Sequence, residues 1–253
     1  MTNTATEINS STGVSEAATP SVTNTDTAAI ASPPATITFA DFGLDPKIQK
    51  AVLEQGYNTP TPIQAQSIPH VLAGSDLMGA AQTGTGKTAA FVLPIIQKIL
   101  RHASNSASPA RHPIRALVLT PTRELAVQVA ENAASYSQYT DLRTAVVYGG
   151  VDMKEQVTIL RNGVEILIAT PGRLLDHIGS KVANLSQVEI LVLDEADRML
   201  DMGFVHDVKR IIKLIPAKRQ SRRAAGLGHR RDEMISHPIS WPLYRIIGAW
   251  SWD

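Results

Sequence analysis

A glycine-rich stretch followed by a lysine and a threonine is the first feature of this sequence that could do chemistry. Residues 81–88 have the sequence AQTGTGKT and follow an apolar run at 76–81. Glycines let backbone N–H groups curl around phosphate oxygens, a lysine reaches the terminal phosphates, and a hydroxyl can hold magnesium. The candidate phosphate-binding residues are Thr83, Gly84, Thr85, Gly86, Lys87 and Thr88. The alternative is a glycine-rich turn with an incidental lysine, which the expected strand–loop–helix context disfavours.

Two adjacent carboxylates follow a second apolar run, where residues 190–197 have the sequence ILVLDEAD. A phosphate loop needs a carboxylate at the end of a neighbouring strand to organise magnesium and water. We therefore expect Asp194 to hold magnesium and Glu195 to polarise an attacking water as a general base. Taken alone, these residues are also compatible with a helix N-cap followed by an acidic first turn.

Alternating strands and helices must position the phosphate loop and the two carboxylates. Little polar alternation occurs within the apolar runs, which suits strands buried on both faces. Strands are expected at 76–81, 115–120, 143–148, 165–170 and 189–194, and helices at 87–100, 123–139, 152–160 and 204–215. A further helix is expected to start at Asp45-Pro46, an N-cap followed by a first-turn proline. This alternation predicts an α/β fold with a parallel sheet flanked by helices.

Composition excludes several classes of protein. The 253 residues are 43% hydrophobic, enough for a sizeable core, and no apolar run reaches the about 18 residues of a membrane span. The absence of cysteine excludes disulfide scaffolds, thiolate metal sites and thiol catalysis. The seven histidines show no metal-like grouping, so each is assigned to the surface or the core. Cytoplasm is the default location.

The two ends differ in composition from the middle. Residues 1–36 are rich in Thr, Ser and Ala, contain no Lys or Arg, and predict a disordered leader. Residues 218–253 carry seven basic and three acidic side chains and all three tryptophans, although the whole chain has a net charge of only +1. The C-terminal segment is therefore unlike the sequence that precedes it.

Further motifs accompany the phosphate loop and the carboxylates. GYNTPTPIQ occurs at 56–64, PTRELA at 121–126, Gly149-Gly150 after a strand, and TPGR at 170–173. Together, in this order and spacing, they resemble the first domain of the DEAD-box ATP-dependent RNA helicases, most closely the bacterial members. The resemblance covers roughly residues 38–220. It implies a RecA-like P-loop domain, ATP and Mg²⁺ as cofactors, and RNA as partner.

The resemblance also assigns roles to individual residues. It implies that Gln64 bonds the adenine edge, that Phe39 stacks on the base, and that Asp197 couples the nucleotide site to other residues. The residues expected to line the RNA backbone are Pro121, Thr122, Arg123, Gly149, Gly150, Thr170, Gly172 and Arg173. Contacts to phosphate and ribose do not distinguish bases, so the RNA specificity is expected to be low.

Each of these residues also has a structural interpretation. Thr61 and Gln64 have the spacing of a helix capping box, so Gln64 could serve the helix rather than adenine. Arg123 and Arg173 could be solvated arginines at helix starts, and Gly149-Gly150 is most simply a turn. In the family the turn and the RNA contact are compatible, since a glycine turn lets RNA approach the backbone.

The resemblance stops after Gln220. The family continues with a strand that ends in Ser-Ala-Thr and then a second RecA-like domain, neither of which follows here. A basic, tryptophan-bearing RNA-binding extension is one explanation. A shifted reading frame or misjoined gene segment is the other, and it is favoured because the break interrupts a core strand. The resemblance to P-loop folds with an additional strand implies that the missing strand lies between the phosphate-loop strand and the DEAD strand. The one plausible substitute in the C-terminal segment is 243–250.

These observations give a domain plan and a function. We expect a leader at 1–36, an ATP-binding RecA-like domain at 37–220, and an aberrant basic segment without an assigned domain at 221–253. The resemblance implies ATP hydrolysis coupled to local opening of RNA duplexes, which we expect to be impaired here because the chain holds only the first of two domains. We also expect an incomplete sheet and a poorly folded chain. The alternatives are an inactive RNA- or ATP-binding product of a frameshifted gene, and a P-loop ATPase that does not act on RNA.

Overall fold

The computed structural model describes residues 37–80, 84–216 and 246–250. Thr83 and the first residues of the phosphate loop lie outside these ranges, as do the expected leader and most of the C-terminal segment. The helices are η1 (Phe39–Phe42), α1 (Pro46–Glu54), α2 (Pro62–Ala73), α3 (Lys87–Ile99), η2 (Leu100–His102), η3 (Pro109–Arg111), α4 (Arg123–Ser137), α5 (Met153–Arg161), α6 (Pro171–Gly179), α7 (Ala196–Asp201) and α8 (Val205–Leu214). The strands are β1 (Leu77–Ala80), β2 (Ala116–Leu119), β3 (Thr144–Val147), β4 (Ile166–Ala169), β5 (Ile190–Asp194) and β6 (Ile246–Trp250).

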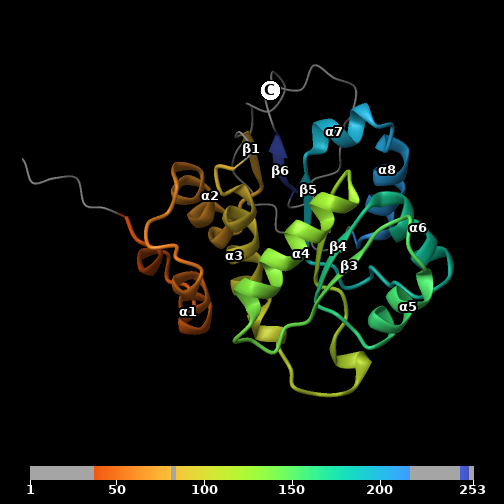
Figure 1. The fold of residues 1–253 in the computed structure, drawn as a ribbon, viewed down its shortest axis with the longest axis horizontal. Coiled ribbons are helices and arrows are strands. Elements are labelled where there is room, and N and C mark those ends of the chain that lie inside the picture. Colours follow the sequence, from red (N-terminus) through yellow and green to blue (C-terminus); the bar gives the residue numbers. More distant parts are fainter. Residues whose placement is uncertain (1–36, 81–83, 217–245, 251–253) are drawn as a thin grey trace, which may run out of the picture. The chain divides into compact units, whose positions relative to one another are not determined.

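The strands form one parallel sheet in the order β1-β6-β5-β2-β4-β3 (Figure 1). The five strands expected from the apolar runs are all present, and their parallel pairing confirms the predicted α/β fold. The expected helix at 204–215 is present as α8. The helices α6 and α7 begin where Arg173 and the DEAD carboxylates had structural interpretations as a helix start and a helix N-cap, and Pro171 is well suited to the first turn of α6.

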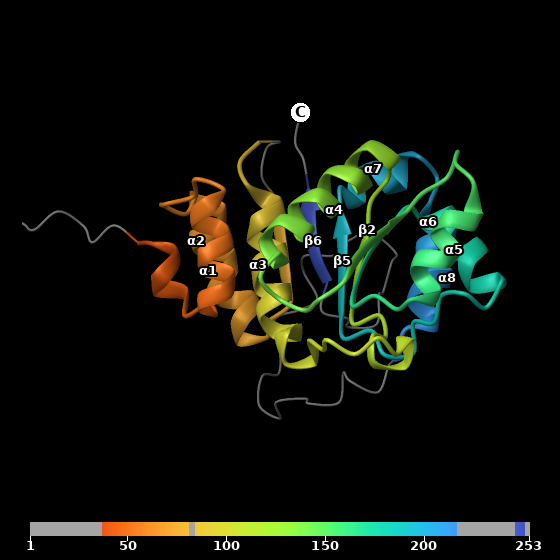
Figure 2. The same cartoon turned by 60° about the horizontal axis from the view of Figure 1, so that its bottom comes forward.

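Two apolar cores cover opposite faces of the sheet. Alternate residues of β2, β4 and β5 belong to one core together with α1–α4, and the intervening residues belong to a second core together with α5–α8. In Figure 2 the strands run between α1, α2 and α3 on one side and α5, α6 and α8 on the other. Burial on both faces explains why ALVL and ILIA contain no polar alternation.

The strand β6 occupies the position that the helicase-like segment leaves open. The five strands before residue 220 leave the sheet incomplete between β1 and β5, as expected. In the structure, β6 pairs in parallel with both neighbours, with Gly248 opposite Met78 of β1 and Leu193 of β5. The substitute strand proposed at 243–250 is therefore present at Ile246–Trp250. β6 therefore pairs with β1 and with β5 where the backbone hydrogen bonds were expected to be missing.

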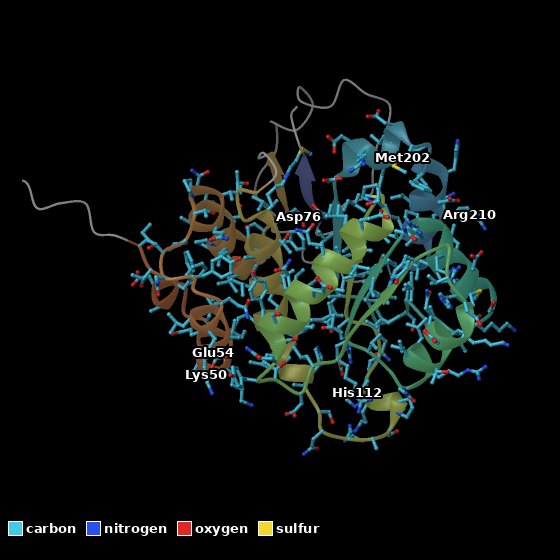
Figure 3. All side chains as sticks on the ribbon, in the orientation of Figure 1. Lys50, Glu54, Asp76, His112, Met202 and Arg210 are labelled. Atoms are coloured by element: carbon cyan, nitrogen blue, oxygen red, sulfur yellow. The ribbon has the colours of Figure 1, made fainter. Side chains whose placement is uncertain are left out.

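Polar contacts fix the first helix to the body of the domain. Lys50 and Glu54 project from α1 (Figure 3), with the Lys50 ammonium 4.0 Å from the centre of the Tyr139 ring. The Tyr139 hydroxyl donates a hydrogen bond to Glu54 Oε2, and the Gln138 side-chain amide donates to the same oxygen at 3.2 Å. These contacts hold α1 against the end of α4.

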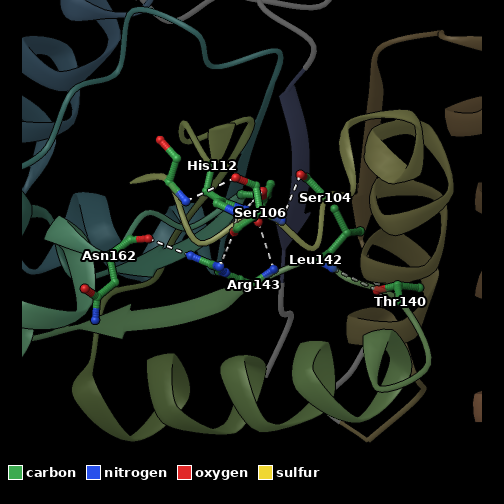
Figure 4. A network of polar contacts seen from close by, with 9 residues as sticks. Ser104, Ser106, His112, Thr140, Leu142, Arg143 and Asn162 are labelled. Carbon is green, nitrogen blue, oxygen red and sulfur yellow. Dashed lines mark hydrogen bonds and ion pairs between the residues drawn. The ribbon is translucent and has the colours of Figure 1, made fainter. Parts of the chain in front are cut away.

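A buried ion pair anchors the connector between α3 and β2. His112 Nδ1 lies 2.5 Å from Glu165 Oε1, and neither side chain is exposed. The Arg143 guanidinium donates to the carbonyl oxygens of Asn162 and Ser106, and His112 Nε2 contacts the same Ser106 oxygen (Figure 4). This network lies where β2, β3 and β4 begin, at the end of the sheet opposite the phosphate loop.

Candidate functional site

The phosphate loop lies between the end of β1 and the start of α3. Gly84 and Gly86 adopt positive φ angles of 79° and 87°, which glycine reaches without steric cost. Lys87 begins α3, so the free N–H groups and positive dipole of the helix start point into the loop. Lys87 and Thr88 are partly exposed. The described part of the loop thus has the geometry of an anion cradle.

Gln64 is completely buried and bonds the phosphate loop. Its Oε1 accepts a hydrogen bond from the Thr61 backbone N–H at 2.9 Å, and its Nε2 donates to the Gly86 carbonyl at 3.1 Å. The Thr61 hydroxyl donates to the neighbouring Thr85 carbonyl at 2.8 Å. The capping-box geometry at Thr61 and Gln64 is therefore present, and the same two side chains also hold the backbone of the phosphate loop.

Phe39 is also buried, with 3% of its surface exposed. Its ring packs edge-on against Phe42 at a centroid distance of 5.9 Å and belongs to the core shared with α1–α4. This arrangement leaves almost no ring surface for an adenine base. Stacking of Phe39 on a base would require the ring to leave this core, and its assigned role stays a prediction.

The two carboxylates after β5 differ in surroundings. Asp194 is 4% exposed, and burial, followed by the neighbouring charge of Glu195, raises the pKa of Asp194 to about 6, although the positive charge of Lys87 opposes the shift. Glu195 has a left-handed backbone with φ of 50°, rare outside glycine, and its carboxylate contacts Arg198 at 3.2 Å. Strained backbone of this kind clusters at functional sites. Asp197 has a buried Oδ1 without a hydrogen-bond partner.

The donor atoms near the phosphate loop fit magnesium held partly by a nucleotide. The hydroxyl of Thr88 and the carboxylate of Asp194 are hard oxygen donors, which Mg²⁺ prefers. Within residues 37–80 and 84–216, no group of three or more His, Asp or Glu side chains could hold a metal by itself. Mg²⁺ commonly keeps one or two protein carboxylates and takes its other ligands from phosphate and water.

The residues expected to meet RNA lie at the ends of β2, β3 and β4. Parallel pairing of Leu119 with Ala169, and of Ala169 with Val147, brings the three following loops to the same edge of the sheet. The residues in these loops are Pro121, Thr122, Arg123, Gly149, Gly150, Thr170, Gly172 and Arg173. The edge also carries the phosphate loop after β1 and Asp194 at the end of β5.

The two arginines in these loops are placed differently. Arg123 is exposed, pairs with Glu124 at 2.6 Å, and lies beside Gly150, whose absent Cβ would be 3.6 Å from Arg123 Nη1. Arg173 is largely buried, with 11% of its side chain exposed, and donates from Nη2 to the Val151 carbonyl at 3.0 Å. Arg123 is therefore available at the surface, whereas Arg173 faces the glycine turn.

Comparisons with known proteins agree with this geometry. A family model described as DEAD/DEAH box helicase matches residues 61–226. The chain belongs to this family. It is 49% identical over 183 residues to the ATP-dependent RNA helicase CshA of Listeria monocytogenes, and 45% identical over 186 residues to the DEAD-box ATP-dependent RNA helicase CshA of Bacillus subtilis. It is 40% identical over 209 residues to the ATP-dependent RNA helicase RhlB of Hamiltonella defensa.

This DEAD-box chain aligns with only part of each relative. The alignments cover 72%, 74% and 81% of the chain but 34%, 36% and 49% of the Listeria, Bacillus and Hamiltonella proteins. The chain therefore spans between a third and half of the length of the relatives that it matches. No helix within the described residues is long and apolar enough to cross a membrane.

Two buried side chains of the DEAD-box domain were missed from sequence. Gln156 on α5 and His177 on α6 are 6% and 0% exposed, and they hydrogen-bond each other behind the Gly149-Gly150 turn. From the sequence, Gln156 was given no role and His177 was assigned only to the surface or the core. The available signal was the spacing of His177 four residues after Arg173, which places both on one helix face.

Proposed function

We propose that this chain binds ATP with Mg²⁺ and supplies the ATP-hydrolysing half of a DEAD-box RNA helicase. The observation that carries the proposal is the meeting of the phosphate loop and the DEAD carboxylates at one edge of the sheet. Lys87 acts electrostatically on Asp194, which supports a shared site for phosphate, metal and carboxylate. Ligands of parallel α/β sheets commonly bind at this edge.

Within this proposal each residue of the site has one task. The Gly84–Gly86 backbone and Lys87 hold the phosphates, Thr88 and Asp194 supply oxygen ligands for Mg²⁺, and Glu195 accepts a proton from the attacking water. Bound Mg²⁺ would neutralise the negative charge that develops between the phosphates. Strain in the Glu195 backbone supports a fixed direction for this carboxylate, because a relaxed helical residue would point elsewhere.

Gln64 supports a link between the base and the phosphate loop. Because its amide bonds the Gly86 carbonyl, a change in its hydrogen bonding on adenine binding would reach the loop backbone directly. We propose that Gln64 exchanges one of its present bonds for the adenine edge. The same residue would then select the base and fix the loop.

The loops after β2, β3 and β4 support an RNA-binding edge beside the nucleotide site. Exposed Gly149 and Gly150 leave room for a phosphate backbone, and Arg123 adds a positive charge next to them. Such contacts hold phosphate and sugar without distinguishing bases. We propose sequence-independent binding of single-stranded RNA, coupled to ATP through the shared edge.

The 253 residues by themselves are expected to work weakly. The motifs of one domain occur within 37–220, and the alignments cover only 34% and 49% of the Listeria and Hamiltonella relatives. We propose weak ATP binding and little duplex unwinding by this chain alone.

The second candidate is a product that binds RNA or ATP without turnover, and the departure from the family pattern after Gln220 favours it. Whether that departure is a frameshift is decided by translating the other two frames downstream of Gln220.

Turnover separates the two candidates. RNA-stimulated release of phosphate from ATP by the wild-type chain would contradict the weak activity proposed for it and favour the hydrolysing candidate. Such activity should be abolished by Glu195→Gln and survive Glu131→Gln, which alters an exposed carboxylate of α4. ATP and RNA binding without phosphate release would favour the non-enzymatic candidate. Stimulation by single-stranded DNA equal to that by RNA would contradict RNA as the partner.

A further inference from the structure

The Gly149-Gly150 turn is held from behind at both of its ends. On one side the Gln156 side chain donates from Nε2 to the Tyr148 carbonyl at 3.0 Å, just before the turn. On the other side Arg173 donates from Nη2 to the Val151 carbonyl at 3.0 Å, just after the turn. The two glycines are exposed between these bonds. The turn is therefore clamped at the residues that flank it, while its own backbone faces outward.

His177 completes the clamp. A carbonyl oxygen only accepts hydrogen bonds, so the nitrogen of the Gln156 amide faces Tyr148 and its oxygen faces His177. His177 Nε2 lies 3.0 Å from that oxygen and must donate its proton to it. His177 Nδ1 is buried and has no hydrogen-bond partner, as expected for a neutral ring with its proton on Nε2. Burial and the nearby charge of Arg173 lower the pKa of His177, which agrees with a neutral ring.

The three side chains come from two helices that cover the same face of the sheet. Arg173 and His177 lie one turn apart on α6, and Gln156 lies on α5. Arg173 Nε and Nη1 are buried and have no hydrogen-bond partner, so these atoms do not present themselves to an external phosphate. Apolar side chains would also fill this space, and burying polar groups costs stability. The presence of a buried polar chain therefore indicates that the geometry it fixes matters.

We propose that Gln156 and His177, together with Arg173, are positioning residues that orient the Gly149-Gly150 turn for contact with the RNA backbone. The chain of donors runs from His177 to Gln156 to the Tyr148 carbonyl and sets the angle at which β3 enters the turn. None of the three touches RNA in this role. The inference rests on the proposed RNA-binding function of this edge.

Two measurements on the 253-residue chain test the proposal. The first is hydrogen–deuterium exchange at the amides of Gly149, Gly150 and Val151. The second is the affinity for a fluorescein-labelled decauridylate, measured by anisotropy at fixed salt. The variants are Gln156→Leu and His177→Leu, which remove the relay, and His177→Gln, whose amide nitrogen can replace the lost donor. Exposed His70→Leu and Gln128→Leu are the matched controls.

Both leucine variants are expected to speed exchange at the turn and to weaken decauridylate binding about tenfold, equivalent to loss of one hydrogen bond. His177→Gln is expected to restore both to within about twofold, and affinity for a fluorescent ATP analogue should not change. A purely structural role would instead lower the thermal midpoint and affect both ligands alike. Unchanged exchange and RNA affinity in both leucine variants would overturn the proposal. If the wild-type chain binds no RNA, the proposed function fails. The exchange data alone still show whether Gln156 and His177 hold the Gly149-Gly150 turn.

Discussion

Asp194 is a carboxylate buried at the end of β5, and this burial, with the repulsion from Glu195, raises its pKa to about 6. A folded chain that holds a proton more tightly than the unfolded chain loses stability as pH rises through the interval between the two pKa values. For Asp194 this interval runs from its ordinary value of 3.8 to about 6. The charge that a metal site requires therefore destabilises the metal-free fold above pH 6.

Asp194→Asn is expected to stabilise the metal-free chain at pH 7.5. Because the pKa of Asp194 rises from 3.8 to about 6, the gain in stability is roughly 3 kcal/mol at most. The gain should shrink as pH falls from 6 to 4 because wild-type Asp194 becomes neutral. Thermal midpoints in EDTA across this pH range measure the effect. A less stable Asn variant at pH 7.5 would show that the ionised carboxylate stabilises the fold.

Gly86→Ala is expected to destabilise the chain because of a specific neighbour. The new Cβ would lie 2.3 Å from Gln64 Nε2, and the backbone φ of 87° is itself unfavourable for alanine. The backbone strain costs about 1–2 kcal/mol and the overpacking a further 1–3 kcal/mol. Urea unfolding of the single variants and of Gly86→Ala with Gln64→Ala separates these costs. In the Gln64→Ala background only the backbone cost should remain; strict additivity would exclude the contact.

Helices and strands were predicted well where a local sequence pattern defines them. Apolar runs located β1–β5 within two residues, and helix patterns located α3, α4 and α5 with similar accuracy. The bond from Gln64 to Gly86 spans 22 residues and the bond from Gln156 to His177 spans 21, so no sequence period reports either. The 243–250 run was expected to substitute for the strand between β1 and β5, and the pairing of β6 with Met78 and Leu193 agrees with that expectation.

The strand β6 is expected to be essential for cooperative folding. It pairs with β1 on one side and β5 on the other, so its loss would leave two rows of backbone groups unpaired, each costing about 1–3 kcal/mol. Gly248→Pro places a residue without an N–H in the middle of this strand. Thermal unfolding followed by circular dichroism should lose its single sharp transition. An unaltered transition would mean that the chain folds without β6, and poor folding of the wild type would support the incomplete-sheet expectation.

The buried pair of His112 and Glu165 is a second element-scale test. The Ser106 carbonyl can only accept, so His112 Nε2 carries a proton, and the contact between Nδ1 and Glu165 requires another proton in the pair. Removing Glu165 leaves buried His112 Nδ1 and the Arg143 backbone N–H without the carboxylate that they contact. Glu165→Ala should therefore cost about 3–5 kcal/mol in urea unfolding. A cost below 1 kcal/mol would indicate that the connector between α3 and β2 relaxes freely.

At the scale of the whole molecule, one edge of a parallel sheet collects the phosphate loop, the DEAD carboxylates and the loops after β2, β3 and β4. Parallel strands bring their carboxyl ends together, so loops separated by more than a hundred residues become neighbours. The phosphate loop and Asp194 occupy the side of β1 and β5, and the glycine turn and Arg123 occupy the side of β2, β3 and β4. This division predicts that nucleotide and RNA sites can be altered separately.

Binding of a fluorescent ATP analogue in the presence of Mg²⁺ tests the central claim most directly. The wild-type chain should show saturable binding that EDTA abolishes and that Lys87→Ala weakens at least tenfold, because the lysine charge meets the phosphates. Lys209→Ala, an exposed lysine on α8, is the control and should bind like the wild type. Equal binding by Lys87→Ala and wild type, or no saturable binding at millimolar nucleotide, would contradict a nucleotide site at this edge.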